Sequence, residues 1–407
     1  MLTGTGCERA ARRRPIEAPG HCYTDAHMSA PDTQRPRYAG VAELLRHKTT
    51  DTPVFCYLPA RISEDCTAFC RGFPGEVYYA VKANPDPEVL QWVVEGGVQA
   101  FDVASLSEIE GVHRVLPAAH CAYNHPVKQR SSLGTAYRRW SIRDFVVDHP
   151  LELQKVLEET GRDIVVQVRV AAPNAAAAVS FNAKFGATAA ETVALLRTLK
   201  DLKITAALTM HLGWQTTEPG AYDAGIRLLA QLARAADVRL EYLNVGGGFP
   251  SVLMPRQLQL GDFFAAIKAA ADAEFGPAAM PLHCEPGSAL VTRGGAVLTQ
   301  VLLVKEDGLY LNDGIYGAMA ELIHSRIQPP TRVFAPGGQP RTGPLRRLRT
   351  FGPTCDSFDT SPEPFQVPAD TREGDWLFLE SMGAYSAPLI TDFNGLGAHE
   401  FAVLDNV

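Results

Sequence analysis

The sequence predicts an α/β fold, a (β/α)8 TIM barrel, followed by a C-terminal β domain, and three observations support this. From Val54 onward, short apolar runs alternate with longer amphipathic stretches, which indicates parallel strands joined by helices. About eight such units span roughly 230 residues, which suits a closed barrel better than an open sheet. After about Pro286, short apolar runs are separated by Gly, Pro and Asp, which is typical of β structure with little helix.

The individual elements follow from these patterns. The expected barrel strands are 54–58, 77–81, 100–104, 121–124, 145–148, 164–170, 208–213 and 242–248. The clearest expected helices are 106–116, 150–161, 189–202 and 224–237, where apolar residues recur at helical spacing. In the β domain, 294–317, 346–355 and 375–386 contain the strand-like runs, and the stretch "APGGQPRTGPLRR" is expected to be an exposed loop.

We divide the chain into four parts. Residues 1–30 are expected to be a disordered tail or the product of a wrongly assigned start, because they contain a basic cluster without an apolar core and Met28 offers a second start. Residues 31–53 are expected to pack on the β domain, residues 54–285 to form the barrel, and residues 286–407 to form the β domain.

Composition limits the partners and the compartment. With 46% hydrophobic and 20% charged residues among 407, the chain is an ordinary globular protein. The net charge of -7 argues against nucleic acid as a partner, and no apolar run approaches the roughly 20 residues that cross a membrane. Eight cysteines are scattered without CxxC pairs or zinc-like spacing, so we expect no metal site and a cytoplasmic, reducing location.

Polar residues and glycines stand at the carboxyl ends of six expected strands, where functional groups of such barrels gather. They are Lys82, Asp102, Arg169, His211, Gly246–Gly248 and Glu285. Lys82 closes the apolar run "VYYAV", and we expect desolvation at the barrel mouth to lower its pKa and make its amine a nucleophile. Taken alone, this lysine could also extend into solvent, but the six features together indicate one site.

The set suits amine chemistry with pyridoxal phosphate. A lysine can hold this cofactor as a Schiff base, and adjacent glycines let backbone N–H groups approach its phosphate. A carboxylate facing the pyridine nitrogen keeps that nitrogen protonated, and Glu285 is the candidate. An imidazole such as His211 can stack on the ring.

From about Tyr38 to its end, the chain resembles the ornithine/diaminopimelate/arginine decarboxylase family of fold-type III pyridoxal-phosphate enzymes, closest to the ornithine decarboxylase-like branch. The motifs "YAVKAN", "FDVAS", "AKFG", "HLG", "NVGGGFP", "EPG", "GPTCDSFD" and "GDWLFLESMGAY" follow in the family's order. The resemblance implies an alanine-racemase-like barrel with a β domain. It also implies Lys82 as the Schiff-base lysine, His211 on the ring, Glu285 at the pyridinium with Arg169 supporting it, Asp102 in the cofactor site, and Gly247, Gly248 and Tyr385 at the phosphate.

The "GPTCDSFD" segment implies a shared site. In the family, this loop reaches the partner subunit's barrel, so that the active site forms in a homodimer. Cys355 would then be the proton donor after CO2 loss, and Asp356 would bind the distal amine of a small amino-acid substrate.

The sequence departs from the family pattern in three ways. Ser288 stands where an arginine normally clamps the phosphate, and Trp214 stands where a serine is usual. His324 and Ser325 replace a Tyr-Asp pair whose aspartate helps to bind the distal amine in ornithine decarboxylases. We therefore count Ser288 with the cofactor-binding residues, and His324 and Ser325 with the substrate-binding residues.

The predicted function is decarboxylation of a basic amino acid, ornithine- or lysine-like, or of a modified diamino acid, in polyamine or specialised-metabolite biosynthesis. Two alternatives stay open. An amino-acid racemase on the same fold would need a second acid/base, and the loop with Cys355 and Asp356 argues against it. A catalytically silent regulatory homologue would have no need of Lys82, His211, Glu285 and Cys355 together.

Overall fold

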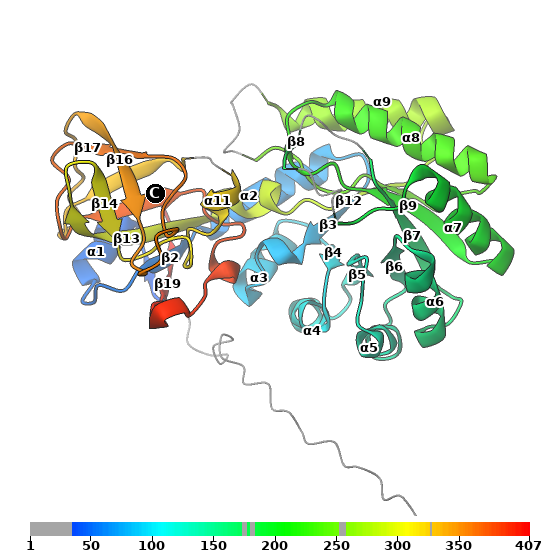
Figure 1. Cartoon of the computed structure of the whole chain (residues 1–407), viewed down its shortest axis with the longest axis horizontal. Helices are drawn as coiled ribbons and strands as arrows, with labels where there is room; N and C mark the ends of the chain where they lie inside the picture. Colours follow the sequence, from blue (N-terminus) through cyan, green and yellow to red (C-terminus); the bar gives the residue numbers. More distant parts are fainter. Residues whose placement is uncertain (1–34, 173–176, 180–183, 252–257, 326–327) are drawn as a thin grey trace, which may run out of the picture. The chain divides into compact units, whose positions relative to one another are not determined.

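The computed structural model describes residues 35–172, 177–179, 184–251, 258–325 and 328–407. Within these ranges, eight strands close into a parallel barrel and nine strands form a second, mixed sheet (Figure 1). No helix in these ranges is long and apolar enough to cross a membrane. The predicted fold class, a TIM barrel with a separate β domain, is thus confirmed.

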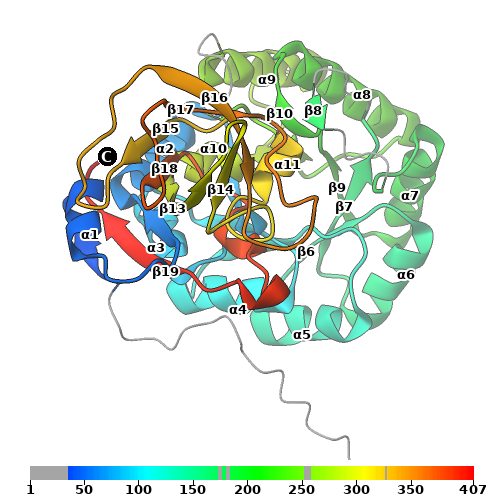
Figure 2. The same cartoon turned by 60° about the vertical axis from the view of Figure 1, so that its left-hand side comes forward.

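The barrel strands are β3 (Glu76–Ala80), β4 (Ala100–Val103), β5 (His120–Tyr123), β6 (Asp144–Val147), β7 (Val165–Val170), β9 (Thr205–Met210), β11 (Leu243–Asn244) and β12 (Leu282–Cys284). They close in the order β11-β12-β3-β4-β5-β6-β7-β9. The surrounding helices are α2 (Pro59–Gly72), α3 (Pro87–Glu95), α4 (Leu106–Val115), α5 (Arg130–Trp140), α6 (Pro150–Glu159), α7 (Ala189–Leu202), α8 (Gly220–Ala236) and α9 (Leu260–Phe275) (Figure 2). Helix α2 contacts both α3 and α9, so the ring of helices is continuous there.

Several of these helices begin at residues that cap them. The side chain of Asp86 accepts a hydrogen bond from the backbone N–H of Glu88 at the start of α3. Ser105 does the same for Glu108 at the start of α4. Such caps satisfy backbone donors that have no partner within the helix. They fix each helix start just after a barrel strand, and so fix the short loops at the barrel mouth.

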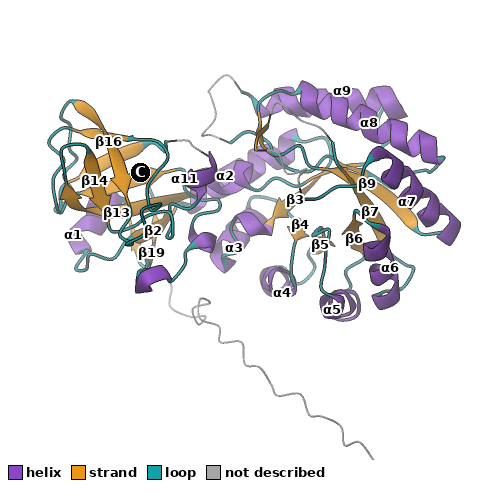
Figure 3. Cartoon of the chain, in the orientation of Figure 1, coloured by secondary structure: helices purple, strands orange, loops and turns teal. Residues whose placement is uncertain are grey.

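The second sheet contains β1 (Arg37–Tyr38), β2 (Val54–Tyr57), β13 (Gly295–Val304), β14 (Gly308–Leu311), β15 (Thr331–Phe334), β16 (Leu345–Phe351), β17 (Phe365–Pro368), β18 (Trp376–Glu380) and β19 (Glu400–Leu404) (Figure 3). Helix α1 (Val41–His47) adds Leu44 and Leu45 to the core of this sheet.

Strand β2 corrects one prediction. It pairs with β13 and β19 in the second sheet, so the expectation that residues 54–58 form a barrel strand is wrong. The eighth barrel strand is β12, which ends just before Glu285. All four residues of β2 are buried, and an apolar run of this kind suits a barrel strand and a central sheet strand equally well. Only the pairing partner distinguishes the two.

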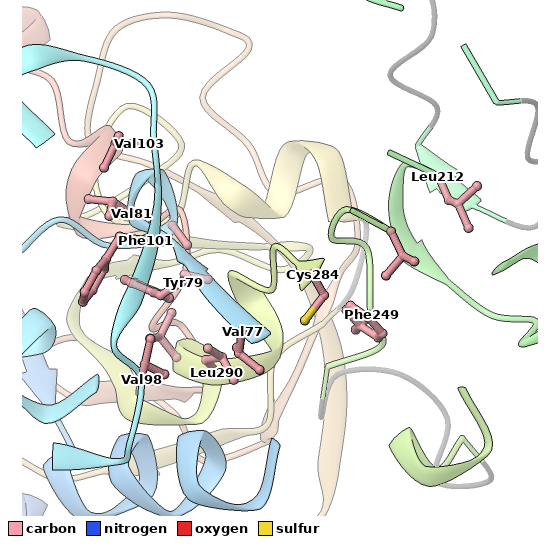
Figure 4. Packing of buried hydrophobic residues seen from close by; sticks show 14 of the residues in the cluster. Val77, Tyr79, Val81, Val98, Phe101, Val103, Leu212, Phe249, Cys284 and Leu290 are labelled. Carbon is pink, nitrogen blue, oxygen red and sulfur yellow. The ribbon is translucent and has the colours of Figure 1, made fainter. Parts of the chain in front are cut away.

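Strand β3 leads from the core to the barrel mouth. Val77 and Tyr79 pack with Phe101 and Leu290 in the large apolar cluster, which includes residues of both the barrel strands and the surrounding helices (Figure 4). Tyr78, one residue out of phase, belongs to a separate small cluster with Ala100 and Ala122. A single turn, Val81–Ala83, follows the strand and carries Lys82. Because side chains alternate along a strand, this register separates the packing residues from those that reach the barrel interior.

Candidate active site

The carboxyl ends of the barrel strands carry the predicted residues. Lys82 follows β3, Asp102 lies in β4, Arg169 lies in β7, His211 follows β9, the glycine loop follows β11 and Glu285 follows β12. Since β11, β12, β3 and β4 are consecutive around the barrel, the glycine loop, Glu285, Lys82 and Asp102 share one sector of its rim.

Lys82 and Asp102 form an ion pair at this rim. The Lys82 Nζ lies 2.6 Å from the Asp102 Oδ2; the Asp102 side chain is buried, while that of Lys82 keeps 45% of its surface accessible. Burial lowers the pKa of Lys82, but the charges of Asp102, Tyr385 and Glu285 outweigh it, so the pKa lies above its usual value. The expectation of a lowered pKa is therefore wrong, because the carboxylate stabilises the ammonium form.

Glu285 lies buried beside this pair. Its Oε1 accepts hydrogen bonds from Asn124 Nδ2 at 2.7 Å and from Asn244 Nδ2 at 2.6 Å. Burial and the nearby charge of Asp102 raise its pKa to about 7, and the charges of Lys82 and Arg169 act in the opposite direction. A carboxylate with a pKa near neutrality can hold or release a proton at a ring nitrogen under ordinary conditions.

His211 is neutral in this setting. Burial lowers its pKa well below the usual value, and the charges of Arg169 and Lys82 lower it further. Its Nδ1 accepts a hydrogen bond from the backbone N–H of Gly213 at 3.1 Å, so the ring proton lies on Nε2. An uncharged imidazole is suited to stacking on an electron-poor ring.

Arg169 acts on Glu285 at a distance. Among the described residues, no hydrogen bond or ion pair joins the two side chains, although the charge of Arg169 lowers the pKa of Glu285. Burial lowers the pKa of Arg169. The charges of Glu285, Asp102 and Asp148 raise it, but the net result is a pKa below the usual value. The predicted support of Glu285 by Arg169 is thus electrostatic in this structure.

The glycine loop is built so that backbone can approach a ligand. Gly246 and Gly248 have φ values of 71° and 86°, which glycine adopts without strain. A Cβ at Gly247 would lie 2.5 Å from the Glu285 carbonyl oxygen, so no side chain fits there. The Tyr385 backbone N–H donates to the Ala83 carbonyl at 2.8 Å, which ties this β-domain tyrosine to the turn that carries Lys82. This arrangement fits a phosphate held by backbone N–H groups and a hydroxyl.

A small cavity lies beside Ser288. It has a volume of about 10 Å³, room for about one water molecule, and its lining includes Trp214, Ser288, Glu321 and Ser381. Among the described residues, the buried Trp214 Nε1 has no hydrogen-bond partner. Burial raises the pKa of Glu321 to about 8, so this carboxyl is largely protonated at neutral pH. Uncharged hydrogen-bonding groups therefore line this cavity.

The structure does not bring Cys355 and Asp356 to the barrel. Cys355 is exposed on the loop between β16 and β17, with its Sγ 3.3 Å from Asn394 Oδ1. Asp356 accepts hydrogen bonds from the Tyr316 hydroxyl and from the backbone N–H of Phe358. Both line an open groove of about 510 Å³ whose lining residues all belong to the β domain. Among the described residues, no hydrogen bond or ion pair links either of them to a barrel residue.

Two predicted substrate residues are placed only in part. His324 and Ser325 belong to α11 (Glu321–Ser325), but their side chains lie outside the described residues. Their predicted contact with substrate therefore stays a prediction.

Sequence reasoning missed three amides around Glu285. Asn124 follows β5, Gln167 lies within β7, and Asn244 ends β11; all three are buried. The sequence does contain an indication of these residues, because each of the three amides is an uncharged polar residue in or next to an apolar strand. A buried amide in a barrel strand needs hydrogen-bond partners, and here these lead to Glu285.

Comparisons with known proteins agree with this geometry. The family model described as "Pyridoxal-dependent decarboxylase, pyridoxal binding domain" matches residues 59–292. The lysine/ornithine decarboxylase of Selenomonas ruminantium is 30% identical over 361 residues, covering 86% of this chain and 88% of the relative.

Two solved structures are also similar. A crystal structure of lysine decarboxylase from Selenomonas ruminantium has a TM-score of 0.76 and 28% identity, covering 87% of this chain and 93% of that one. The lysine/ornithine decarboxylase of Vibrio vulnificus complexed with putrescine has a TM-score of 0.74 and 26% identity, covering 87% of this chain and 94% of that one. With its paired Lys82 and Asp102, buried Glu285 and glycine loop, the chain belongs to the pyridoxal-dependent decarboxylases and is a pyridoxal-phosphate-dependent amino-acid decarboxylase.

Proposed function

We propose that the protein decarboxylates an L-amino acid with a distal amine, either a basic amino acid of the ornithine or lysine type or a modified diamino acid. The observation that carries this is Asp356, a carboxylate on the same exposed loop as Cys355. A carboxylate beside a proton donor suits a substrate with a cationic end. Relatives named lysine/ornithine decarboxylase, and a similar structure holding putrescine, support the substrate class.

Each barrel residue has a task in this reaction. When bound, pyridoxal phosphate supplies an electron-withdrawing ring that stabilises the charge left when CO2 departs. Lys82 provides the amine that anchors the cofactor, and Asp102 accepts a proton from its ammonium group. Glu285 would hold the proton at the ring nitrogen, and the neutral His211 would pack on the ring. The loop Gly246–Gly248 and Tyr385 bind the phosphate.

We further propose that two copies of the chain share each site. Cys355 and Asp356 have no link to their own barrel in the described residues, while the neighbouring Phe358 is 78% exposed. A large exposed aromatic side chain on a loop is suited to burial against another surface. In a homodimer, this loop would bring Cys355 to the substrate carbon of the other subunit, where its thiol returns a proton after CO2 has left.

The protein is not expected to be specific for free ornithine. The sequence has Ser325 where a second amine-binding carboxylate is usual, so Asp356 alone would bind the distal group. One charged partner in place of two weakens selection for a free terminal ammonium. A longer or modified diamino acid suits this arrangement.

The proposed compartment is the cytoplasm. The described cysteines Cys56, Cys66, Cys70, Cys121, Cys284 and Cys355 are all free thiols, as expected in a reducing environment.

A panel assay tests the proposed reaction. Purified protein with pyridoxal phosphate is given L-ornithine, L-lysine, L-arginine, diaminopimelate and acylated diamino acids, and CO2 and amine are measured. We expect stoichiometric release of both from at least one compound, and none with the Lys82→Ala variant. Racemisation of a panel member without CO2 release would overturn the proposal in favour of a racemase.

A further inference from the structure

The three buried amides around Glu285 form one connected network. We propose that Asn124, Gln167 and Asn244 position the Glu285 carboxylate and tie it to the glycine loop, so that both ends of the cofactor site are set by one hydrogen-bonded unit. The inference rests on the pyridoxal phosphate site and not on the choice of substrate.

The network begins at a backbone group. The Gly246 N–H donates to Asn244 Oδ1 at 2.9 Å, which leaves the Asn244 Nδ2 as a donor. That Nδ2 donates to Gln167 Oε1 at 3.0 Å and to Glu285 Oε1 at 2.6 Å. Because a backbone N–H can only donate, the orientation of the Asn244 amide is fixed by the chain itself.

The remaining orientations follow from this one. Since Gln167 Oε1 accepts from Asn244, its Nε2 is the donor, and it donates to Asn124 Oδ1 at 3.0 Å. Asn124 Nδ2 then donates to Glu285 Oε1 at 2.7 Å. Every amide donates in one direction, toward Glu285. Two N–H groups therefore converge on one carboxylate oxygen.

This convergence acts on the charge of Glu285. Two donors at Oε1 favour the ionised carboxylate, because a proton on that oxygen would meet two N–H groups. Burial favours the neutral acid, so the network opposes burial. Among the described residues no hydrogen bond occupies Glu285 Oε2, so this oxygen would be the one to accept a hydrogen bond from the protonated ring nitrogen. The amides thus select both the charge state and the oxygen that faces the cofactor.

Packing alone does not explain these residues. The interior of such barrels is mostly filled by branched apolar side chains. Asn124, Gln167 and Asn244 are only 8%, 1% and 2% exposed, and buried amides are costly unless their partners are complete. The network also reaches the phosphate end, since the Glu285 backbone N–H donates to the Gly246 carbonyl at 2.8 Å. One unit therefore positions the carboxylate and the glycine loop together.

The first test uses Gln167→Leu, which removes the central amide without altering Glu285 or the glycine loop. We measure the dissociation constant for pyridoxal phosphate from pH 5.5 to 9 by absorbance, and protein stability by urea unfolding. We expect about tenfold weaker cofactor binding at pH 8. Cofactor binding should weaken below a certain pH midpoint, and we expect this midpoint to rise by about one unit in the variant. Without Gln167, the two amides that donate to Glu285 are less well oriented, so its ionised form is less stabilised.

Asn124→Asp separates positioning from packing. It keeps the shape of the side chain but places a second carboxylate against Glu285, so the pH midpoint should rise further than in Asn124→Leu. If Asn124 served only for packing, the isosteric Asn124→Asp variant should instead have the smaller effect and Asn124→Leu the larger one. The matched control is Asn312→Leu, which removes a β-domain amide that accepts from Thr299 and from the Gln300 backbone. It should lower stability and leave the pH midpoint unchanged.

The inference would be overturned if Gln167→Leu and Asn124→Asp reduced only stability, as the control does, and left the cofactor affinity and the pH midpoint unchanged. Because cofactor binding is measured without substrate, this result is independent of the proposed reaction. A failure to find a decarboxylated substrate would leave the network untouched.

Discussion

The Lys82 ammonium and the Asp102 carboxylate lie 2.6 Å apart at the ends of two neighbouring barrel strands, β3 and β4. Ala80 and Asp102 are register partners, so the pairing of the strands sets this distance. The carboxylate keeps the lysine protonated, with a pKa above its usual value despite partial desolvation, and it accepts a hydrogen bond from the Lys82 Nζ. The Lys82 amine is therefore held as an ammonium ion, which must lose a proton before the amine can attack a carbonyl.

Replacing Lys82 with alanine should abolish covalent attachment of pyridoxal phosphate and all activity. Lys82→Arg should fail as well, because a guanidinium stays protonated and forms no imine. Borohydride reduction followed by peptide mass spectrometry measures the attachment site. Cofactor fixed to another lysine in the wild-type protein would show that the assignment is wrong.

Asp102→Asn should lower the pKa of Lys82. Burial already acts in that direction, and the substitution removes the strongest opposing charge. The rate at which the apoprotein forms its covalent adduct, followed by absorbance against pH, should then reach its plateau at lower pH than in the wild type. A profile that does not move would mean that Asp102 leaves the protonation of Lys82 unaffected.

Mixed dimers should recover activity. A Lys82→Ala subunit and a Cys355→Ala subunit are each inactive alone, but a shared site pairs one residue from each chain, so about one intact site in two should return. The proteins carry different affinity tags, and the heterodimer is isolated before CO2 release is measured. No recovery in dimers shown to be mixed would contradict the shared site.

The enzyme should not be a strict ornithine decarboxylase. A hydrogen bond to a charged group contributes about 1.5–3 kcal/mol, so replacement of a carboxylate by Ser325 predicts about a 10- to 150-fold weaker preference for free ornithine. The measurement is kcat/KM for ornithine, lysine, arginine, diaminopimelate and acylated diamino acids. A lead of more than about 100-fold for ornithine, at about 10⁴ M⁻¹s⁻¹ or above, would contradict this.

Protein stability should fall as pH rises toward 8 because of Glu321. Its pKa is raised to about 8 by burial, so the folded state keeps a proton that the unfolded state loses above about 4.3. The unfolded state is therefore favoured progressively between those two values. The Glu321→Gln apoprotein should lose less stability than the wild type between pH 6 and pH 9 in urea unfolding. Glu95→Gln, at an exposed position of α3, is the control and should follow the wild type.

The sequence by itself determined the barrel, the β domain and the placement of Lys82, Asp102, His211 and Glu285 at strand ends. These follow from local patterns, because each strand and its terminal residue are adjacent in the chain and the alternation of strands and helices leaves few topologies. The motif also marked Ser288 as a departure from the family pattern, and its effect on phosphate binding stays a prediction.

The tertiary structure alone decided which elements and side chains meet. The apolar run at Val54–Tyr57 suits either sheet, and only its pairing with β13 and β19 placed it in the β domain. The raised pKa of Lys82 depends on the 2.6 Å approach of Asp102, which lies 20 positions away in sequence. Asn124, whose amide donates to Glu285, lies 161 positions before it in the chain. Distance in space, and with it charge and hydrogen bonding, is set by strand register around the closed barrel, which no local pattern records.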